Sequence, residues 1–159
     1  MSTATHLAEL TAIYEEELAR YTDFLRSARQ LTETLKANAA EAQLSELFTE
    51  QSELIAKINN LDRAARELKN KLAAELGVDE VSVSVVSGLP GAVEFETVLQ
   101  KLAALLLELQ TVEQENTALL EARLKNLVQK RQVPPPKRSI RLAYRKRSES
   151  DDSAIDKKR

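Results

Sequence analysis

Residues 41–76, EAQLSELFTEQSELIAKINNLDRAARELKNKLAAEL, decide the fold class of this chain. Their apolar residues recur at steps of three and four, and Glu, Lys, Arg and Gln fill the positions between them. This spacing places the apolar side chains on one stripe of a 3.6-residue helix. The stripe consists of Leu44, Leu47, Phe48, Leu54, Ile55, Ile58, Leu61, Ala65, Leu68 and Leu72. Because such a stripe must be buried against another helix, we expect the chain to act by offering helix surface.

Two further long segments have the same helical pattern, and a Pro-rich run ends the last of them. We therefore predict an all-α fold, a long antiparallel helical hairpin plus a third long helix, as an elongated three-helix bundle or coiled coil. The expected helices run over about 3–36, 40–76 and 91–131. Together they form one domain, residues 1–133, and residues 134–159 are predicted to be a basic disordered tail because they are too polar to build a core.

The connections carry helix-end signals. Asn38, followed three residues later by Glu41, resembles a capping box for the start of the second helix. Gly77 is suited to the left-handed conformation that closes a helix at its C-terminus. Pro90 is preset for the first position of the third helix. Valines alternate with serines between these signals, but no second strand-like run exists, so residues 77–90 are predicted to be an irregular loop, extended or floppy.

Composition limits the class of protein. Three Gly, four Pro and 4% aromatic residues in 159 positions argue against an all-β fold, whereas 30% charged residues are typical of long helices. The net charge of −2 hides an asymmetry. Residues 1–129 contain 12 Lys and Arg against 21 Asp and Glu, a net charge of −9. Residues 130–159 contain 11 against 4, a net charge of +7, so an acidic body carries a basic tail.

Catalytic and metal sites are not expected. His6 is the only histidine and there is no cysteine, so the sequence supplies no metal-ligand set, no disulfide and no nucleophile paired with a base. No glycine-rich phosphate loop is present. We predict a protein without catalytic activity and without a cofactor. The polar start and the lack of an 18-residue uncharged apolar run predict no signal peptide and no membrane insertion, and the lack of cysteine suits a cytoplasmic protein.

The third predicted helix has one feature that could indicate a binding surface. In the segment QKLAALLLELQ, Leu105 and Leu106 fit the apolar stripe. Leu107 adds an apolar residue outside this stripe, on another side of the helix. Such a helix either lies between two neighbours, as the central helix of the body, or presents a binding surface. Asn116 is an amide within the same stripe. It fits either a polar group that sets the register of the core or an adaptable contact.

The tail segment KRSIRLAYRKR, residues 137–147, is the second feature. Its apolar residues Ile140, Leu142 and Tyr144 alternate with Arg141 and Ala143, as in a short motif that docks as a strand. A solvated tail held loosely on the acidic body is the simplest interpretation. Binding to nucleic acid is not expected, since only one aromatic residue and no recognition fold accompany the charge.

The order and lengths of these segments resemble the FlgN family of flagellar export chaperones. The resemblance covers about Leu7–Lys130 and leaves the basic tail outside. It is carried by LTAIYEEELARYTDFL in the first helix, LFTEQSELIAKINNLDRAARELKNKLAAELG in the second, and ELQTVEQENTALLEARL in the third. Within the last segment, Asn116 is followed by Leu119 and Leu120.

The resemblance implies a non-enzymatic chaperone. It would bind the amphipathic C-terminal segments of flagellar hook-associated (hook–filament junction) proteins, prevent their premature assembly and deliver them to the export gate, a component of which is a further expected partner. The third helix is the expected contact face for such a helix-in-groove complex. Its predicted contact residues are Leu106, Leu109, Val112, Asn116, Leu119, Leu120 and Leu124.

The sequence is also compatible with a scaffold or adaptor protein. The apolar stripes would equally suit a homodimeric coiled-coil scaffold or adaptor whose basic tail contacts an acidic partner. Such a scaffold would be a stable, elongated homodimer without affinity for flagellar cargo. The sequence leaves both monomer and homodimer open, and it assigns Tyr144 no role.

Overall fold

The computed structural model describes residues 2–131, and the predicted tail, with Tyr144, lies outside the described residues. Within residues 2–131 every regular element is a helix, which confirms the all-α prediction. The elements are α1 (Thr3–Lys36), α2 (Glu41–Leu76), α3 (Val83–Val86) and α4 (Ala92–Arg131). The three long helices therefore begin and end within one residue of the bounds expected from their apolar spacing.

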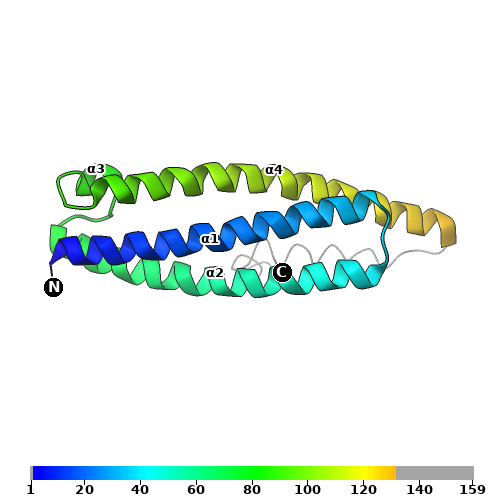
Figure 1. The fold of residues 1–159 in the computed structure, drawn as a ribbon, viewed down its shortest axis with the longest axis horizontal. Helices are drawn as coiled ribbons and strands as arrows, with labels where there is room; N and C mark the ends of the chain where they lie inside the picture. Colours follow the sequence, from blue (N-terminus) through cyan, green and yellow to red (C-terminus); the bar gives the residue numbers. More distant parts are fainter. Residues whose placement is uncertain (1, 132–159) are drawn as a thin grey trace, which may run out of the picture.

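The long helix α1 lies at the centre of the molecule. It packs along its whole length against α2, which runs antiparallel to it, and against α4, which runs parallel to it (Figure 1). The flanking helices α2 and α4 approach each other only marginally. The alternative in which the third long helix is the central one is therefore wrong, because α1 alone has close neighbours on two sides.

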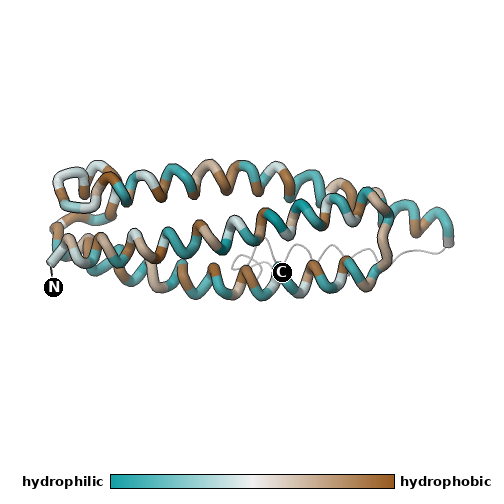
Figure 2. Tube along the Cα trace, viewed as in Figure 1, coloured by the Kyte–Doolittle hydropathy of each residue, from teal (hydrophilic) through white to brown (hydrophobic). Residues whose placement is uncertain are grey.

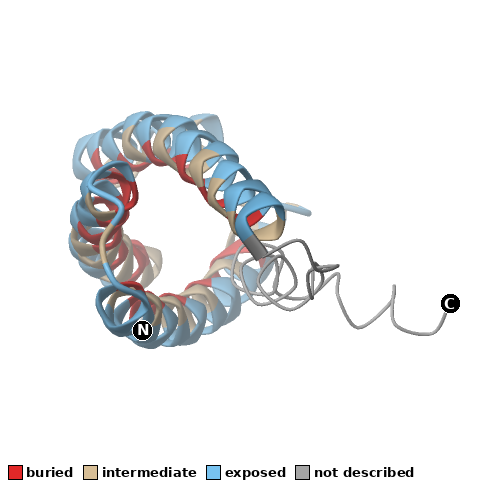
Figure 3. Cartoon of the chain, turned by 90° about the vertical axis from the view of Figure 1, so that its right-hand side faces the viewer, coloured by how far each residue is buried: buried red, intermediate tan, exposed pale blue. Residues whose placement is uncertain are grey.

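Three apolar clusters follow one another along α1 and form the core. Apolar residues are concentrated on the sides of the helices that face one another, and so are the buried residues (Figures 2 and 3). At one end the cluster contains Leu7, Leu10, Ala65, Leu72, Val86 and Phe95. The middle cluster contains Phe24, Leu25, Ala28, Leu54 and Leu109. The cluster at the hairpin end contains Leu31, Leu35, Leu44 and Leu120. Each cluster combines residues of α1, α2 and a later segment, so burial of the stripes on α1 holds the fold together.

The turn between α1 and α2 corrects the capping prediction. Asn38 has a φ of 54°, and its N–H donates to the carbonyl of Leu35 at 3.1 Å. The N–H of Ala39 donates to the carbonyl of Thr34, also at 3.1 Å. These two bonds and the left-handed residue close the C-terminus of α1, where asparagine tolerates positive φ better than most residues. Asn38 therefore ends α1, and Ala40 precedes α2 without a side-chain cap.

The segment between α2 and α4 is more ordered than the valine–serine alternation predicts. Gly77 closes α2 with a φ of 68°, as expected. The predicted extended or floppy loop is wrong at Val83–Val86, which form the single turn α3. Ser82 caps this turn, its Oγ accepting from the N–H of Val85 at 3.3 Å. The turn buries Val86 completely in the end cluster, and this burial outweighs the strand spacing.

The start of α4 also differs from the prediction. Gly91, with a φ of 88°, separates Pro90 from the helix, so that Ala92 is the first helical residue. Pro90 thus lies in the turn before α4 and does not occupy its first position. A residue with a positive φ cannot continue a right-handed helix, and glycine adopts that conformation at no steric cost. The connection from α2 to α4 stays at the end of the molecule where α1 begins, so α4 starts there and runs parallel to α1 (Figure 1).

Candidate functional site

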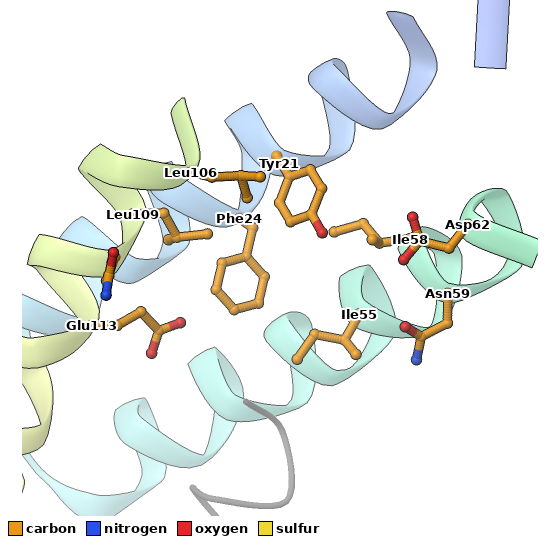
Figure 4. Close-up of a pocket in the computed structure, with 10 residues that line it drawn as sticks. Tyr21, Phe24, Ile55, Ile58, Asn59, Asp62, Leu106, Leu109 and Glu113 are labelled. Atoms are coloured by element: carbon orange, nitrogen blue, oxygen red, sulfur yellow. The ribbon is translucent and has the colours of Figure 1, made fainter. Parts of the chain in front are cut away.

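A groove of about 400 Å³ lies over the middle of α1, between the flanking helices α2 and α4 (Figure 4). It exists because both flanking helices pack on α1 and barely on each other. Its walls and floor are formed by residues of all three long helices. These residues are Tyr21, Phe24, Ile55, Ile58, Asn59, Asp62, Leu106, Leu109, Gln110 and Glu113.

The floor of the groove is apolar. Phe24, Ile58 and Leu109 are buried there and belong to the body of the fold. Leu106, on the α4 wall, keeps 42% of its surface exposed. An apolar side chain that stays in contact with water above an apolar floor gains free energy when another apolar group covers it. The groove therefore offers apolar surface that a further apolar side chain could cover.

The rim of the groove is acidic. Asp62 stands on the α2 wall and Glu113 on the α4 wall, and the lining contains no Lys or Arg. Burial, followed by the negative charges of Asp62 and Glu17, raises the pKa of Tyr21 to about 12. The phenol therefore stays neutral and can donate a hydrogen bond at physiological pH. A partner with positive charges beside an apolar surface matches this rim.

A buried carboxyl group lies one helical turn from the groove. Glu17 is only 4% exposed, and one of its carboxyl oxygens, Oε2, has no hydrogen-bond partner. Burial raises the pKa of Glu17 to about 8, with further increases from its hydrogen bond to Asp62 and from the charge of Asp62, whereas Lys69 acts in the opposite direction. Glu17 is therefore mostly protonated at neutral pH.

The predicted contact face of α4 is directed mainly at α1. Leu109, Leu120 and Leu124 are buried, Asn116 is completely buried, Val112 and Leu119 are half-buried, and only Leu106 is exposed.

Asn116 joins α4 to α1 by hydrogen bonds. Its Nδ2 donates to the carbonyl of Ala28 at 2.9 Å, and its Oδ1 accepts from the hydroxyl of Thr32 at 2.5 Å. These bonds match the interpretation of Asn116 as a polar group that sets the register between the helices.

Comparison with known proteins identifies the family. A family model described as FlgN protein matches residues 1–134. The chain belongs to the FlgN family. The predicted resemblance is therefore confirmed, and with it a general role as a chaperone of flagellar export; the family is one of chaperones and not of enzymes. No curated protein and no solved structure matches the chain.

The groove of this FlgN protein contains residues that the sequence did not single out. Ile55 and Ile58 belong to the predicted apolar stripe of the second helix. Tyr21 belongs to the corresponding stripe of the first helix and Phe24 lies beside that stripe, so all four are typical of ordinary core positions. The angle between neighbouring helices decides which residues of an apolar stripe pack against a third helix and which line a groove. This angle cannot be predicted from the spacing of apolar residues in one sequence. One feature of the sequence did indicate an exposed apolar surface on α4: Leu106 fits the apolar stripe, whereas the neighbouring Leu107 lies outside it.

The described part of the FlgN protein shows no candidate metal site. Within residues 2–131 no group of His, Asp and Glu side chains has the arrangement of a metal site. His6 is paired instead, with its Nδ1 lying 2.8 Å and 2.9 Å from the two carboxylate oxygens of Glu75. None of the helices over these residues is long and apolar enough to cross a membrane.

Proposed function

We propose that this protein binds the amphipathic C-terminal segments of flagellar hook–filament junction proteins, keeps them from assembling early and delivers them to the export gate. Membership in a family of flagellar export chaperones supports this proposal. The observation that carries it is the apolar groove between α2 and α4, with Leu106 exposed on its wall. A client helix lying in the groove would add a fourth helix to the body, which is helix-in-groove recognition.

The free energy available from such a complex is moderate. Burying apolar surface contributes about 25 cal/mol per Å², and a client segment that folds as it binds loses several kcal/mol to ordering. A groove of about 400 Å³ accommodates only a few large side chains. We therefore expect an affinity near the micromolar range, about −8 kcal/mol, which suits a chaperone that must release its client.

The sharpest test compares two neighbouring leucines on α4. Leu106 lines the groove, whereas Leu107 is 66% exposed and is not part of its lining. Because both are exposed, Leu106→Glu and Leu107→Glu should both leave the protein folded. Binding of a junction-protein C-terminal segment, measured by co-expression and then titration, should weaken by about tenfold or more in Leu106→Glu, since a buried carboxylate is costly. Equal affinities in the two variants would contradict a client site in the groove.

The proposed contact face includes Leu109, which lines the groove, and extends beyond the groove to Val112, Asn116, Leu119, Leu120 and Leu124. Most of these side chains pack against α1 in the free protein, so a client would reach them only if α4 moved away from α1.

A disulfide that joins α1 to α4 tests this part of the proposal. The side chains of Thr32 and Asn116 are hydrogen-bonded between α1 and α4, and the chain has no native cysteine, so Cys at both positions is the pair to try, with formation of the disulfide checked on a non-reducing gel. Client affinity that falls on oxidation and recovers on reduction would support the extended face. An unchanged affinity would restrict the contact to the groove.

A homodimeric scaffold is the second candidate, favoured by one observation. Leu107 and Val93 are exposed on α4, at 66% and 72% of their surfaces. Two copies could bury such residues against each other. Light scattering of the purified chain distinguishes the proposals, since a scaffold would be a homodimer that ignores every client segment. In that case Leu107→Glu would yield monomers, while Leu106→Glu would have the smaller effect.

A further inference from the structure

The groove has a charge pattern that a segment of the same chain complements. Its lining combines buried Phe24 and Leu109 and exposed Leu106 with two carboxyl groups, Asp62 and Glu113, on opposite walls. Lys and Arg are absent from the lining. The occupant that fits best is therefore a short segment with apolar residues in its middle and positive charges on both sides.

Residues 137–147, KRSIRLAYRKR, have that composition. Their apolar residues Ile140, Leu142 and Tyr144 lie between a basic pair and a basic triplet, and the segment contains no acidic residue. We propose that this segment docks in the groove of its own chain when no other partner is bound, with the apolar residues against the floor and the basic residues beside Asp62 and Glu113. The proposal does not depend on the identity of any client.

The length of chain after α4 permits this contact within one molecule. Arg131 lies 18 residues after Glu113 on the same helix, so the groove begins about 27 Å back from the end of α4 at 1.5 Å per residue. Leu142 lies 11 residues beyond Arg131, and an extended chain of that length spans up to about 36 Å. The segment therefore reaches the groove with little slack.

A weak interaction is sufficient, because the tether raises the local concentration of the segment. A short flexible linker gives an effective concentration on the order of 1 mM, and a proline-containing linker that must be nearly extended gives less. At an effective concentration of about 0.1 mM, a segment with a dissociation constant of about 0.1 mM as a free peptide would still occupy the groove in about half of the molecules. Much of the attraction is electrostatic, so occupancy should fall as the Debye length shortens from about 10 Å at 0.1 M salt to about 3 Å at 1 M. Any partner that uses the groove would have to displace the segment.

A single spin label in the full-length chain tests the proposal. The chain contains no cysteine, so Ser139→Cys provides one specific attachment site inside the segment. In isotopically labelled protein at 0.1 M salt, we expect loss of amide signal at Ile55, Asp62, Leu109 and Glu113, with recovery at 1 M salt. Signal loss spread evenly over the body, or confined to the end of α4, would overturn the proposal.

Two matched double variants distinguish docking in the groove from a general electrostatic attraction between the basic tail and the acidic body. Asp62→Asn with Glu113→Gln should abolish the signal loss in the groove. Glu53→Gln with Glu96→Gln removes the same charge from exposed positions of the same two helices, neither of which lines the groove, and should retain it. Equal signal loss in both double variants would refute docking at the acidic rim.

Chain length provides an independent test. Deleting residues 132–136 removes five uncharged residues and leaves Leu142 only six residues beyond Arg131, a reach of about 20 Å against the 27 Å required. Signal loss in the groove should disappear although the net charge is unchanged. A mixture of spin-labelled chains and isotopically labelled chains shows whether the contact crosses between molecules. Strong signal loss in that mixture would replace the proposal with docking between two copies.

Discussion

The buried carboxyl group of Glu17 makes the stability of this protein depend on pH in a predictable direction. Its pKa is raised from 4.5 to about 8, first by burial and then by the hydrogen bond to Asp62 and the charge of Asp62. Between these two pH values the folded protein retains the Glu17 proton, whereas the unfolded chain has released it. Because the folded state binds more protons, its stability must fall as the pH rises.

The size of the effect follows from the shift. The stabilising contribution of the retained proton is complete below pH 4.5 and is lost as the pH rises to about 8. Each pH unit in this interval lowers the free energy of unfolding by about 1.4 kcal/mol, which gives a loss of roughly 3 kcal/mol between pH 4.5 and pH 7. Stabilities of small domains are only about 5–15 kcal/mol, so the effect is large.

Urea unfolding at several pH values between 4.5 and 8 measures this contribution. Glu17→Gln is uncharged and its amide can still donate a hydrogen bond to Asp62, so it imitates the protonated carboxyl group. The stability of Glu17→Gln relative to the natural protein should rise by roughly 3 kcal/mol from pH 4.5 to pH 7. Glu16→Gln, an exposed neighbour, serves as the control and should change the pH dependence little. If the curves of Glu17→Gln and the natural protein stay parallel, Glu17 does not carry a raised pKa in the folded state.

Three further changes test the packing around α1 by thermal or urea unfolding. Asn116→Ala should destabilise by about 2–3 kcal/mol, since it removes two buried hydrogen bonds and side-chain volume, whereas exposed Asn126→Ala should change stability by less than about 0.5 kcal/mol. Leu72→Ala, at a fully buried position, should cost about 3–5 kcal/mol; a loss below 1 kcal/mol would contradict its place in the end cluster. Gly77→Ala should cost about 1 kcal/mol, because a Cβ there meets no atom within 4 Å and only the positive φ opposes it.

The sequence predicted the helices well and their arrangement less well. Apolar spacing alone located the three long helices, because a stripe that repeats over 30 or more residues has no competing interpretation. It did not reveal that α1 is central, since all three stripes are of similar composition. The turns were harder still. Asn38 carries the same local signal whether it begins one helix or ends the previous one, and only its φ of 54° decides between them.

Only two of the seven predicted contact residues line the groove, and the predicted contact face stays a prediction. The leucine-rich part of α4 does border the groove, through Leu106 and Leu109. The α1 and α2 residues opposite them could not be recognised, because side chains from segments about 50 and 80 residues apart meet there. Glu17 was also missed. The triplet Glu15, Glu16 and Glu17 is typical of a solvated face, yet Glu17 is buried, near Asp62 of α2.

The central position of α1 explains how the groove stays open in a stable protein. The α4 wall is held on α1 by the buried bonds of Asn116 to Ala28 and Thr32, and by an ion pair of 3.1 Å between Lys36 and Glu115. The α2 wall is held on α1 through Leu54 in the middle cluster, to which Leu109 of α4 also belongs. Apart from this shared core, α2 and α4 contact each other only marginally. In the proposed complex, a client segment that entered the groove would therefore gain apolar contacts without first separating α2 from α4, which suits a chaperone of amphipathic segments.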